Sequence, residues 1–196
     1  MQCSLWSHVR GMTLVELMVT VSVMAIVVAI AVPSFATSIN STRLSSSATE
    51  LSAALQLARA EAIKRNRDVV LCRSNDLVSC ATGGQWNGWL IFVDANGNGT
   101  LDASEEIVKA GAIDSPLVLR ASVAISSQAD QVRFPPSGMA RGASGAALLN
   151  AALAFCAPSA PAASNNVRDV HINFGGRTSV RSRDTAGDCS AAPVDA

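Results

Sequence analysis

The chain has 196 residues, 15 basic and 15 acidic side chains, a formal net charge of zero at pH 7 and no tyrosine. A neutral chain has no overall attraction for nucleic acid or acidic lipid, so such a site would need a local cluster of charge. Aromatic residues make up only 4% of the sequence, which fits a small-residue helix and strands better than a large aromatic ligand pocket.

A long apolar segment follows a short polar leader at the N-terminus. Residues 12–33 are predicted to form a membrane-spanning helix, because about 20 apolar helical residues cross a bilayer core. Residues 1–11 are predicted to be a targeting segment outside the fold. Glu16 lies one turn inside the segment, where an unpaired ionisable group costs about 2.5–3.5 kcal/mol. Cleavage after Gly11 would supply a partner, the new α-amino group of Met12 in the same or a neighbouring chain.

These residues resemble a known signal. Gly11, Met12, Thr13-Leu14-Val15-Glu16-Leu17, the apolar helix and Pro33 together resemble the class III signal of type IV pilins and of type II secretion pseudopilins. The resemblance implies cleavage after Gly11 by a prepilin peptidase, N-methylation of Met12, and assembly with other pilins or pseudopilins through the N-terminal helix and Glu16. The alternative is a simple signal anchor, but an ordinary secretory signal has an apolar region of only about 7–15 residues.

The helix is predicted to resume after Pro33, since a proline is tolerated in a membrane helix where neighbouring groups satisfy the freed carbonyl. Residues 34–67 are predicted to form an amphipathic spine, because apolar residues recur at helical spacing. This stripe, expected to pack on the globular domain, consists of Leu44, Ala48, Leu51, Leu55, Ala58 and Ala62. The opposite side is interpreted as a solvated face and carries Glu50, Arg59, Glu61, Lys64, Arg65 and Arg67.

The residues that follow the leader and the span are enough for one domain and not comfortably for two. Short β-like runs separated by turn residues fill residues 68–196. The predicted strands are 69–72, 89–93, 107–109, 117–120, 123–125, 132–134, 153–156, 167–174 and, after a Gly175-Gly176 hairpin turn, 177–183. Residues 140–153 and 157–166, rich in small residues and proline, are predicted to be loops. The predicted class is α+β, with a long N-terminal helix packed on an antiparallel β-rich domain.

Further motifs of this domain resemble those of the GspH/FimT group of minor pilins and pseudopilins. They are Cys72-Arg73-Ser74, Trp86-Asn87-Gly88-Trp89 with Phe92-Val93-Asp94, Phe134-Pro135-Pro136-Ser137-Gly138 and Phe174-Gly175-Gly176-Arg177. The resemblance implies a single-pass inner-membrane protein with its globular domain in the periplasm. It also implies a minor subunit of a type IV pilus or of a type II secretion pseudopilus, acting in filament assembly or priming. Both machines use this signal and this spine, so the choice between them stays open.

Four cysteines lie outside the leader, an even number that suits an oxidising compartment. Three pairings are open. We favour Cys72 with Cys80, across a short loop, and Cys156 with Cys189, which would clamp the C-terminal hairpin and tail. A zinc site is the competing interpretation, but no C-x-x-C step is present and the only histidine after the leader is His171.

The segment from Asp94 to Glu105 matches the calcium-loop pattern D-x-[DN]-x-[DN]-G-x5-E. The candidate ligands are Asp94, Asn96, Asn98, Thr100, Asp102 and Glu105. Calcium is therefore a candidate ligand, although no cofactor is required. The alternative is a polar hairpin loop in which the Asn-Gly steps supply positive φ, since strands rather than helices are predicted on both sides.

Arginines outnumber acids near the C-terminus, and a local surplus can hold phosphates. The candidate nucleic-acid residues are Arg168, Arg177, Arg181 and Arg183. Some minor pilins of the resembled group are associated with DNA capture through arginines after a Gly-Arg turn, so a DNA-binding subunit is the alternative function. The other interpretation is a solvated sheet edge protected by charge.

An enzyme is not predicted. The chain has no G-x-S-x-G motif, and only one histidine follows the leader, so the sequence offers no general base beside a nucleophile. No sequence feature brings two carboxylates together for glycoside chemistry except the 94–105 loop.

Overall fold

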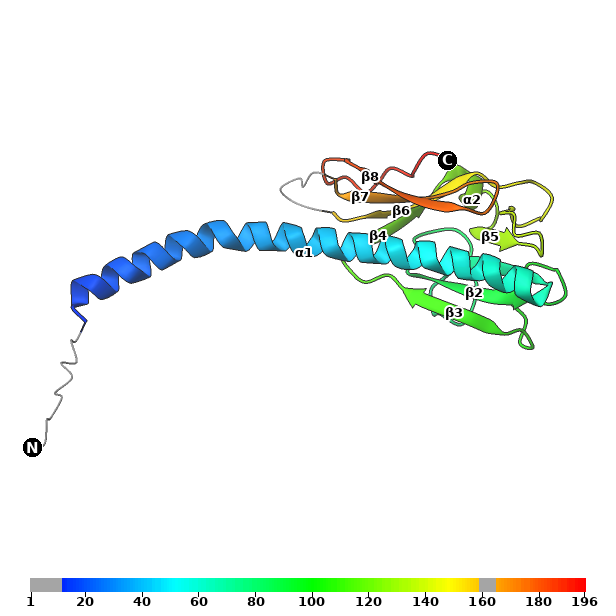
Figure 1. Cartoon of the computed structure of the whole chain (residues 1–196), viewed down its shortest axis with the longest axis horizontal. Coiled ribbons are helices and arrows are strands. Elements are labelled where there is room, and N and C mark those ends of the chain that lie inside the picture. The colour runs from blue at the N-terminus through cyan, green and yellow to red at the C-terminus, as the bar shows by residue number, and fades with distance from the viewer. Residues whose placement is uncertain (1–11, 159–164) are drawn as a thin grey trace, which may run out of the picture. The chain divides into compact units, whose positions relative to one another are not determined.

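The structure is a computed structural model that describes residues 12–158 and 165–196. The chain divides into two compact units, 1–39 and 40–196. Helix α1 (Leu14–Arg65) provides the helical part of the first unit and continues into the second, which adds eight strands and the one-turn helix α2 (Val123–Ser126) (Figure 1). The predicted α+β class is confirmed.

Local sequence signals set the two ends of α1. Thr13 precedes the helix, and its hydroxyl accepts the backbone N–H of Glu16 at 3.2 Å, which satisfies one of the free donors of the first turn. The backbone remains helical through Pro33. Asn66 then adopts a left-handed conformation with φ of 52°, a common way for a helix to end.

The strands form two four-stranded antiparallel sheets. The first sheet has the order β3 (Ile107–Ala112), β2 (Gly88–Asp94), β1 (Asp68–Ser74) and β5 (Gln131–Phe134). The second sheet has the order β4 (Val118–Ala121), β6 (Ala151–Cys156), β7 (Val167–Ile172) and β8 (Thr178–Arg183).

A single apolar cluster joins the C-terminal half of α1 to both sheets. The predicted stripe is buried throughout, with Leu51, Leu55 and Ala58 fully inaccessible. Ile91 of the first sheet and Leu153 of the second belong to the same cluster. The small alanines of the stripe let the sheets approach the helix backbone closely.

Residues 123–125, predicted as a strand, form part of α2 instead. The β4–β6 pairing ends at Ser122, whose hydroxyl accepts the N–H of Ala152 at 3.1 Å. The Ser122 carbonyl accepts the N–H of Ser126 at 3.0 Å, which closes a helical turn. Side-chain hydrogen bonding at Ser122 therefore overrides the β preference of the valine and isoleucine that follow.

The outer face of the first sheet is buried as well. Val70, Leu90 and Phe92 form a second apolar cluster, and Leu101 from the 94–105 loop packs against it. Cys80, from the connection between β1 and β2, lies against the same cluster. Two connecting loops thus cover this face, and every residue of β2 is buried.

Two of the sequence motifs meet on α1. The Arg59 guanidinium donates from Nε to the carbonyl of Gly138 at 2.9 Å, and Gln56 donates to the carbonyl of Gly176 at 3.1 Å. Arg59 is half-buried, so its assignment to a fully solvated face is wrong. It connects the turn after β5 with the turn between β7 and β8.

The contact between these turns gives a sharp prediction. Gly176 has a φ of +71°, and a Cβ there would lie 2.4 Å from the Gly138 carbonyl oxygen, whereas a Cβ on Gly175 would meet nothing within 4 Å. Gly176→Ala is expected to lower the free energy of unfolding by about 2 kcal/mol or more, because it adds backbone strain and a clash. Gly175→Ala is the matched control and is expected to change it by about 0.5 kcal/mol or less. Thermal unfolding of the full chain in detergent measures both, and equal melting temperatures would contradict the prediction.

Candidate functional site

The N-terminal part of α1 exposes a continuous apolar surface. The segment Leu14–Ala31 has a mean hydropathy of 2.6 and is long and apolar enough to cross a membrane, and none of it is buried within the chain. Its hydroxyls are satisfied internally, since Thr20 donates to the carbonyl of Leu17 and Ser22 to that of Met18. Such bonds remove the cost of carrying these groups into lipid.

Glu16 is the exception on this surface. The sequence has no other ionisable side chain between it and Arg43, and the Glu16 carboxylate has no hydrogen bond or ion pair within the described residues. Met12, four residues earlier, is exposed. Gly11, the predicted cleavage position, lies outside the described residues.

The 94–105 loop is organised around the buried carboxylate of Asp94. Its Oδ1 accepts the N–H of Gly97 at 2.7 Å and its Oδ2 accepts that of Gly99 at 2.8 Å. Both glycines have positive φ, 75° and 76°, so they supply the left-handed turns that direct these amides inward. The side chain of Asp94 is completely inaccessible.

Arg133 of β5 supplies the positive charge for this carboxylate. Its Nη2 lies 3.1 Å from Asp94 Oδ2. Its Nη1 donates to Asp68 Oδ2 at 2.8 Å and to the carbonyl of Gly97 at 3.3 Å. Its side chain is only 7% exposed. Buried charges are tolerated when paired and hydrogen-bonded in this way. Of the six candidate calcium ligands, Asp94 is thus paired with a guanidinium.

Four of the other five candidate calcium ligands, all except Thr100, also accept N–H donors through their side-chain oxygens. Asp102 accepts from the side-chain amides of Asn96 and Asn98. Glu105 accepts the backbone N–H groups of Ala95 at 2.8 Å and Asp102 at 3.1 Å. Among the described residues, no three His, Cys, Asp or Glu side chains are grouped so that they could hold a metal ion. The geometry is that of the alternative, a hydrogen-bonded connection between β2 and β3.

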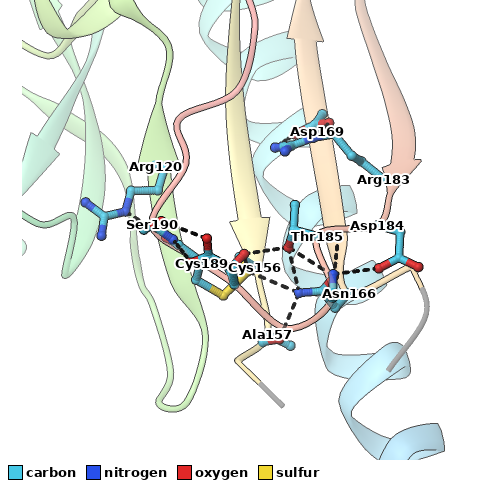
Figure 2. The surroundings of a disulfide bond; sticks show 12 residues. Arg120, Cys156, Ala157, Asn166, Asp169, Arg183, Asp184, Thr185, Cys189 and Ser190 are labelled. Atoms are coloured by element: carbon cyan, nitrogen blue, oxygen red, sulfur yellow. Dashed lines mark hydrogen bonds and ion pairs between the residues drawn. A yellow bond between two sulfur atoms is a disulfide. The ribbon is translucent and has the colours of Figure 1, made fainter. Parts of the chain in front are cut away.

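Two disulfides staple the second unit, Cys72–Cys80 and Cys156–Cys189, in the pairing favoured above. Figure 2 shows the second, which attaches the tail to β6. Beside it, Arg120 donates to the carbonyl of Cys189 at 3.1 Å. The tail is thus held across the outer face of the second sheet.

The buried side chain of Asn166 reinforces this attachment (Figure 2). Its Oδ1 accepts the N–H of Thr185 at 2.9 Å, and its Nδ2 donates to the Thr185 hydroxyl at 3.0 Å. The same Nδ2 lies 3.5 Å from the sulfur of Cys156. Asn166 therefore connects the segment that follows β8 with the Cys156–Cys189 disulfide.

The candidate nucleic-acid arginines do not share one face. Arg168 lies opposite Ser182 in the β7–β8 register, whereas Arg181 lies opposite Asp169, so Arg168 and Arg181 belong to different faces of the sheet. Arg183 is held by Asp169, with Nε 2.8 Å from Oδ2, and this carboxylate raises the pKa of its guanidinium. Arg177 and Arg181 are exposed, and their guanidinium groups make no hydrogen bond or ion pair within the described part of the chain.

The sequence did not predict the structural roles of Arg133 and Arg59, whose guanidinium groups hold the 94–105 loop and the turn after β5. In β5, Val132 and Phe134 face the main core, so alternation predicts Gln131 and Arg133 on a solvated face. The loop covers that face instead. The available signal was Asp94, because a carboxylate that is buried needs a positive partner or hydrogen-bond donors.

A helix with an exposed apolar half carries one carboxylate that is unpaired within the described residues, and it continues into an antiparallel domain with two disulfides. These features define a pilin-like subunit. Residues 47–176 match the family described as type II transport protein GspH, and residues 6–32 match the prokaryotic N-terminal methylation motif. The chain belongs to the GspH family of minor pilins and pseudopilins, whose members are structural subunits and not enzymes.

Solved structures of a minor pilin and of a minor pseudopilin are similar to the chain. The type IV minor pilin FimU of Pseudomonas aeruginosa is 20% identical, with a TM-score of 0.46 over 78% of this chain and 98% of that one. The minor pseudopilin EpsH of the Vibrio cholerae type 2 secretion system is 14% identical, with a TM-score of 0.48 over 72% and 97%. No curated protein matches the sequence.

Removing the buried cation tests the loop geometry. Arg133→Met is expected to lower the free energy of unfolding by about 3 kcal/mol or more, because it leaves the carboxylates of Asp94 and Asp68 without their partner. Arg141→Met is the matched control: the Arg141 guanidinium donates to the carbonyls of Gly145 and Ala146, and a loss of about 1 kcal/mol is expected. Denaturant titration of the full chain measures both.

The same titration tests calcium. Millimolar calcium is expected to leave the midpoint of the wild-type chain unchanged, since the oxygens of Asp94 and Glu105 already accept N–H donors. A ligand that binds only the folded state raises the midpoint of unfolding. A rise of the midpoint with calcium would therefore contradict this prediction and show that the folded chain binds calcium.

Proposed function

We propose that the chain is a minor subunit of a type IV pilus or a type II secretion pseudopilus, acting in filament assembly or priming. The leader 1–11 is cleaved after Gly11 and Met12 is N-methylated. Residues 12–33 span the inner membrane before assembly, residues 34–67 form the spine, and residues 68–196 lie in the periplasm. The partners are a prepilin peptidase and other pilins or pseudopilins.

The unpaired Glu16 carboxylate is the observation that carries the proposal. An ionisable group on a lipid-facing apolar surface is energetically costly, so a helix that served only as an anchor would not be expected to carry one. An α-amino group at the mature N-terminus, in this chain or a neighbouring one, would supply the opposite charge. Because pairing with a neighbour requires the two helices to lie alongside, the acid would favour helix packing in a filament.

The experiment follows maturation and assembly of the full chain in its own cell. Intact-mass measurement of the membrane protein is expected to find N-methylated Met12 as the first residue. Glu16→Ala is expected to insert normally, since it makes the span more apolar, but to reach filaments at least about tenfold less, because an opposite charge is left unpaired.

Two comparisons make this result specific. Replacing Gly11 with leucine should block cleavage and leave Met1 in place, while Ser22→Ala, which changes a hydroxyl bonded within its own helix, should assemble as the wild type does. Assembly of uncleaved protein, or normal assembly of Glu16→Ala, would refute the proposal.

DNA capture is the second candidate, and the exposed Arg177 and Arg181 are the observation that favours it. This function predicts that the full chain binds duplex DNA weakly, with log affinity falling by about 0.9 per phosphate contact for each unit of log salt concentration. Arg177→Ala combined with Arg181→Ala should reduce that slope by about two contacts. Arg168→Ala, on the other face, is the control. Equal slopes in the double variant, the Arg168→Ala control and the wild type would exclude the arginine site.

A further inference from the structure

Two of the three Asn-Gly steps in the sequence, Asn96-Gly97 and Asn98-Gly99, lie in the 94–105 loop. Asn-Gly is chemically labile: the backbone nitrogen of the glycine attacks Cγ of the asparagine side chain, a five-membered succinimide forms, and ammonia leaves. Water then opens the ring to give aspartate or isoaspartate. Both asparagines are exposed, so solvent reaches them freely.

In the folded chain, both glycine nitrogens that would attack are already hydrogen-bond donors. The N–H of Gly97 donates to Asp94 Oδ1 at 2.7 Å, and the N–H of Gly99 donates to Asp94 Oδ2 at 2.8 Å. For the reaction to begin, each nitrogen must lose this proton and turn toward the neighbouring side chain. Hydrogen bonds to a buried charged acceptor are among the stronger ones in proteins, and Arg133 fixes the carboxylate that accepts them.

A second carboxylate holds the groups that would be attacked. Asp102 Oδ2 accepts from the side-chain nitrogens of Asn96 at 2.7 Å and Asn98 at 3.0 Å. The amide oxygens are engaged too, because Asn96 Oδ1 accepts the N–H of Asn98 and Asn98 Oδ1 accepts that of Thr100. Each asparagine is therefore fixed at both ends of its amide group.

We propose that the 94–105 loop is a latent deamidation site, held closed by Asp94 on its two glycine nitrogens and by Asp102 on its two asparagine amides. Water is the only co-reactant and ammonia the leaving group. Conversion of one asparagine replaces a donor to Asp102 with a second carboxylate, and like charges at that distance repel. One event therefore loosens the contacts that protect the other step.

Peptide mapping by mass spectrometry of the full chain in detergent tests this during incubation at mildly alkaline pH. In the folded wild type, deamidation at Asn96 and Asn98 should be at least about tenfold slower than in the denatured chain, because reaction requires local opening. Asp94→Asn should speed it about tenfold or more at one or both steps, and Asp102→Ala should do the same.

The third Asn-Gly step provides the internal control. Gly88 lies in β2, paired with Ser74 and Ala112, so Asn87 should react only when the domain unfolds. Faster reaction at 96 and 98 with Asn87 unchanged supports the proposal. If Asp94→Asn also speeds deamidation at Asn87, that variant has opened the whole domain. The Asp102→Ala variant then tests the proposal, because it leaves the Asp94–Arg133 pair in place. Equal rates in folded and denatured wild type, or no acceleration in either variant, would overturn it.

Discussion

Both sheets of the second unit bury a face against one stripe of one helix. Leu44, Leu51 and Leu55 are inaccessible, and residues of β2 and of β6 share their cluster. Burial of a leucine side chain contributes about 1.5–3 kcal/mol, so the apolar stripe of α1 supplies a large part of the core that the two sheets share. Arg59 and Gln56 hold the turn after β5 and the turn between β7 and β8. These two contacts fix where along the helix each sheet lies.

A second constraint is electrostatic. The outer face of the first sheet has no helix over it, and the 94–105 loop covers part of it by inserting Leu101. The loop can do so only because its inward-facing polar groups are satisfied, with Asp94 accepting amides from within the loop and Arg133 balancing its charge. The charge of Asp94 is thus balanced by a residue of the chain itself.

Periodic features were predictable from the sequence, and features that depend on distant partners were not. The spacing of Leu44 to Ala62 identified the helix stripe because burial on one helix face leaves a direct mark on the sequence. Residues 123–125 have the composition of a strand, yet a hydroxyl of the preceding residue redirects the chain. The loop matched a calcium pattern because the same oxygens suit either cation. Only the register between β1 and β5, which brings Arg133 opposite Val70, distinguishes the two.

The Cys156–Cys189 disulfide has a mechanical consequence. It closes a covalent ring that contains β7 and β8. β8 is the edge strand of its sheet and would otherwise be the first strand to peel away when the C-terminal tail is pulled. With the bond in place, tension applied beyond Cys189 passes directly to β6, which is paired on both sides. The load then falls on an interior strand, which is hydrogen-bonded to both β4 and β7.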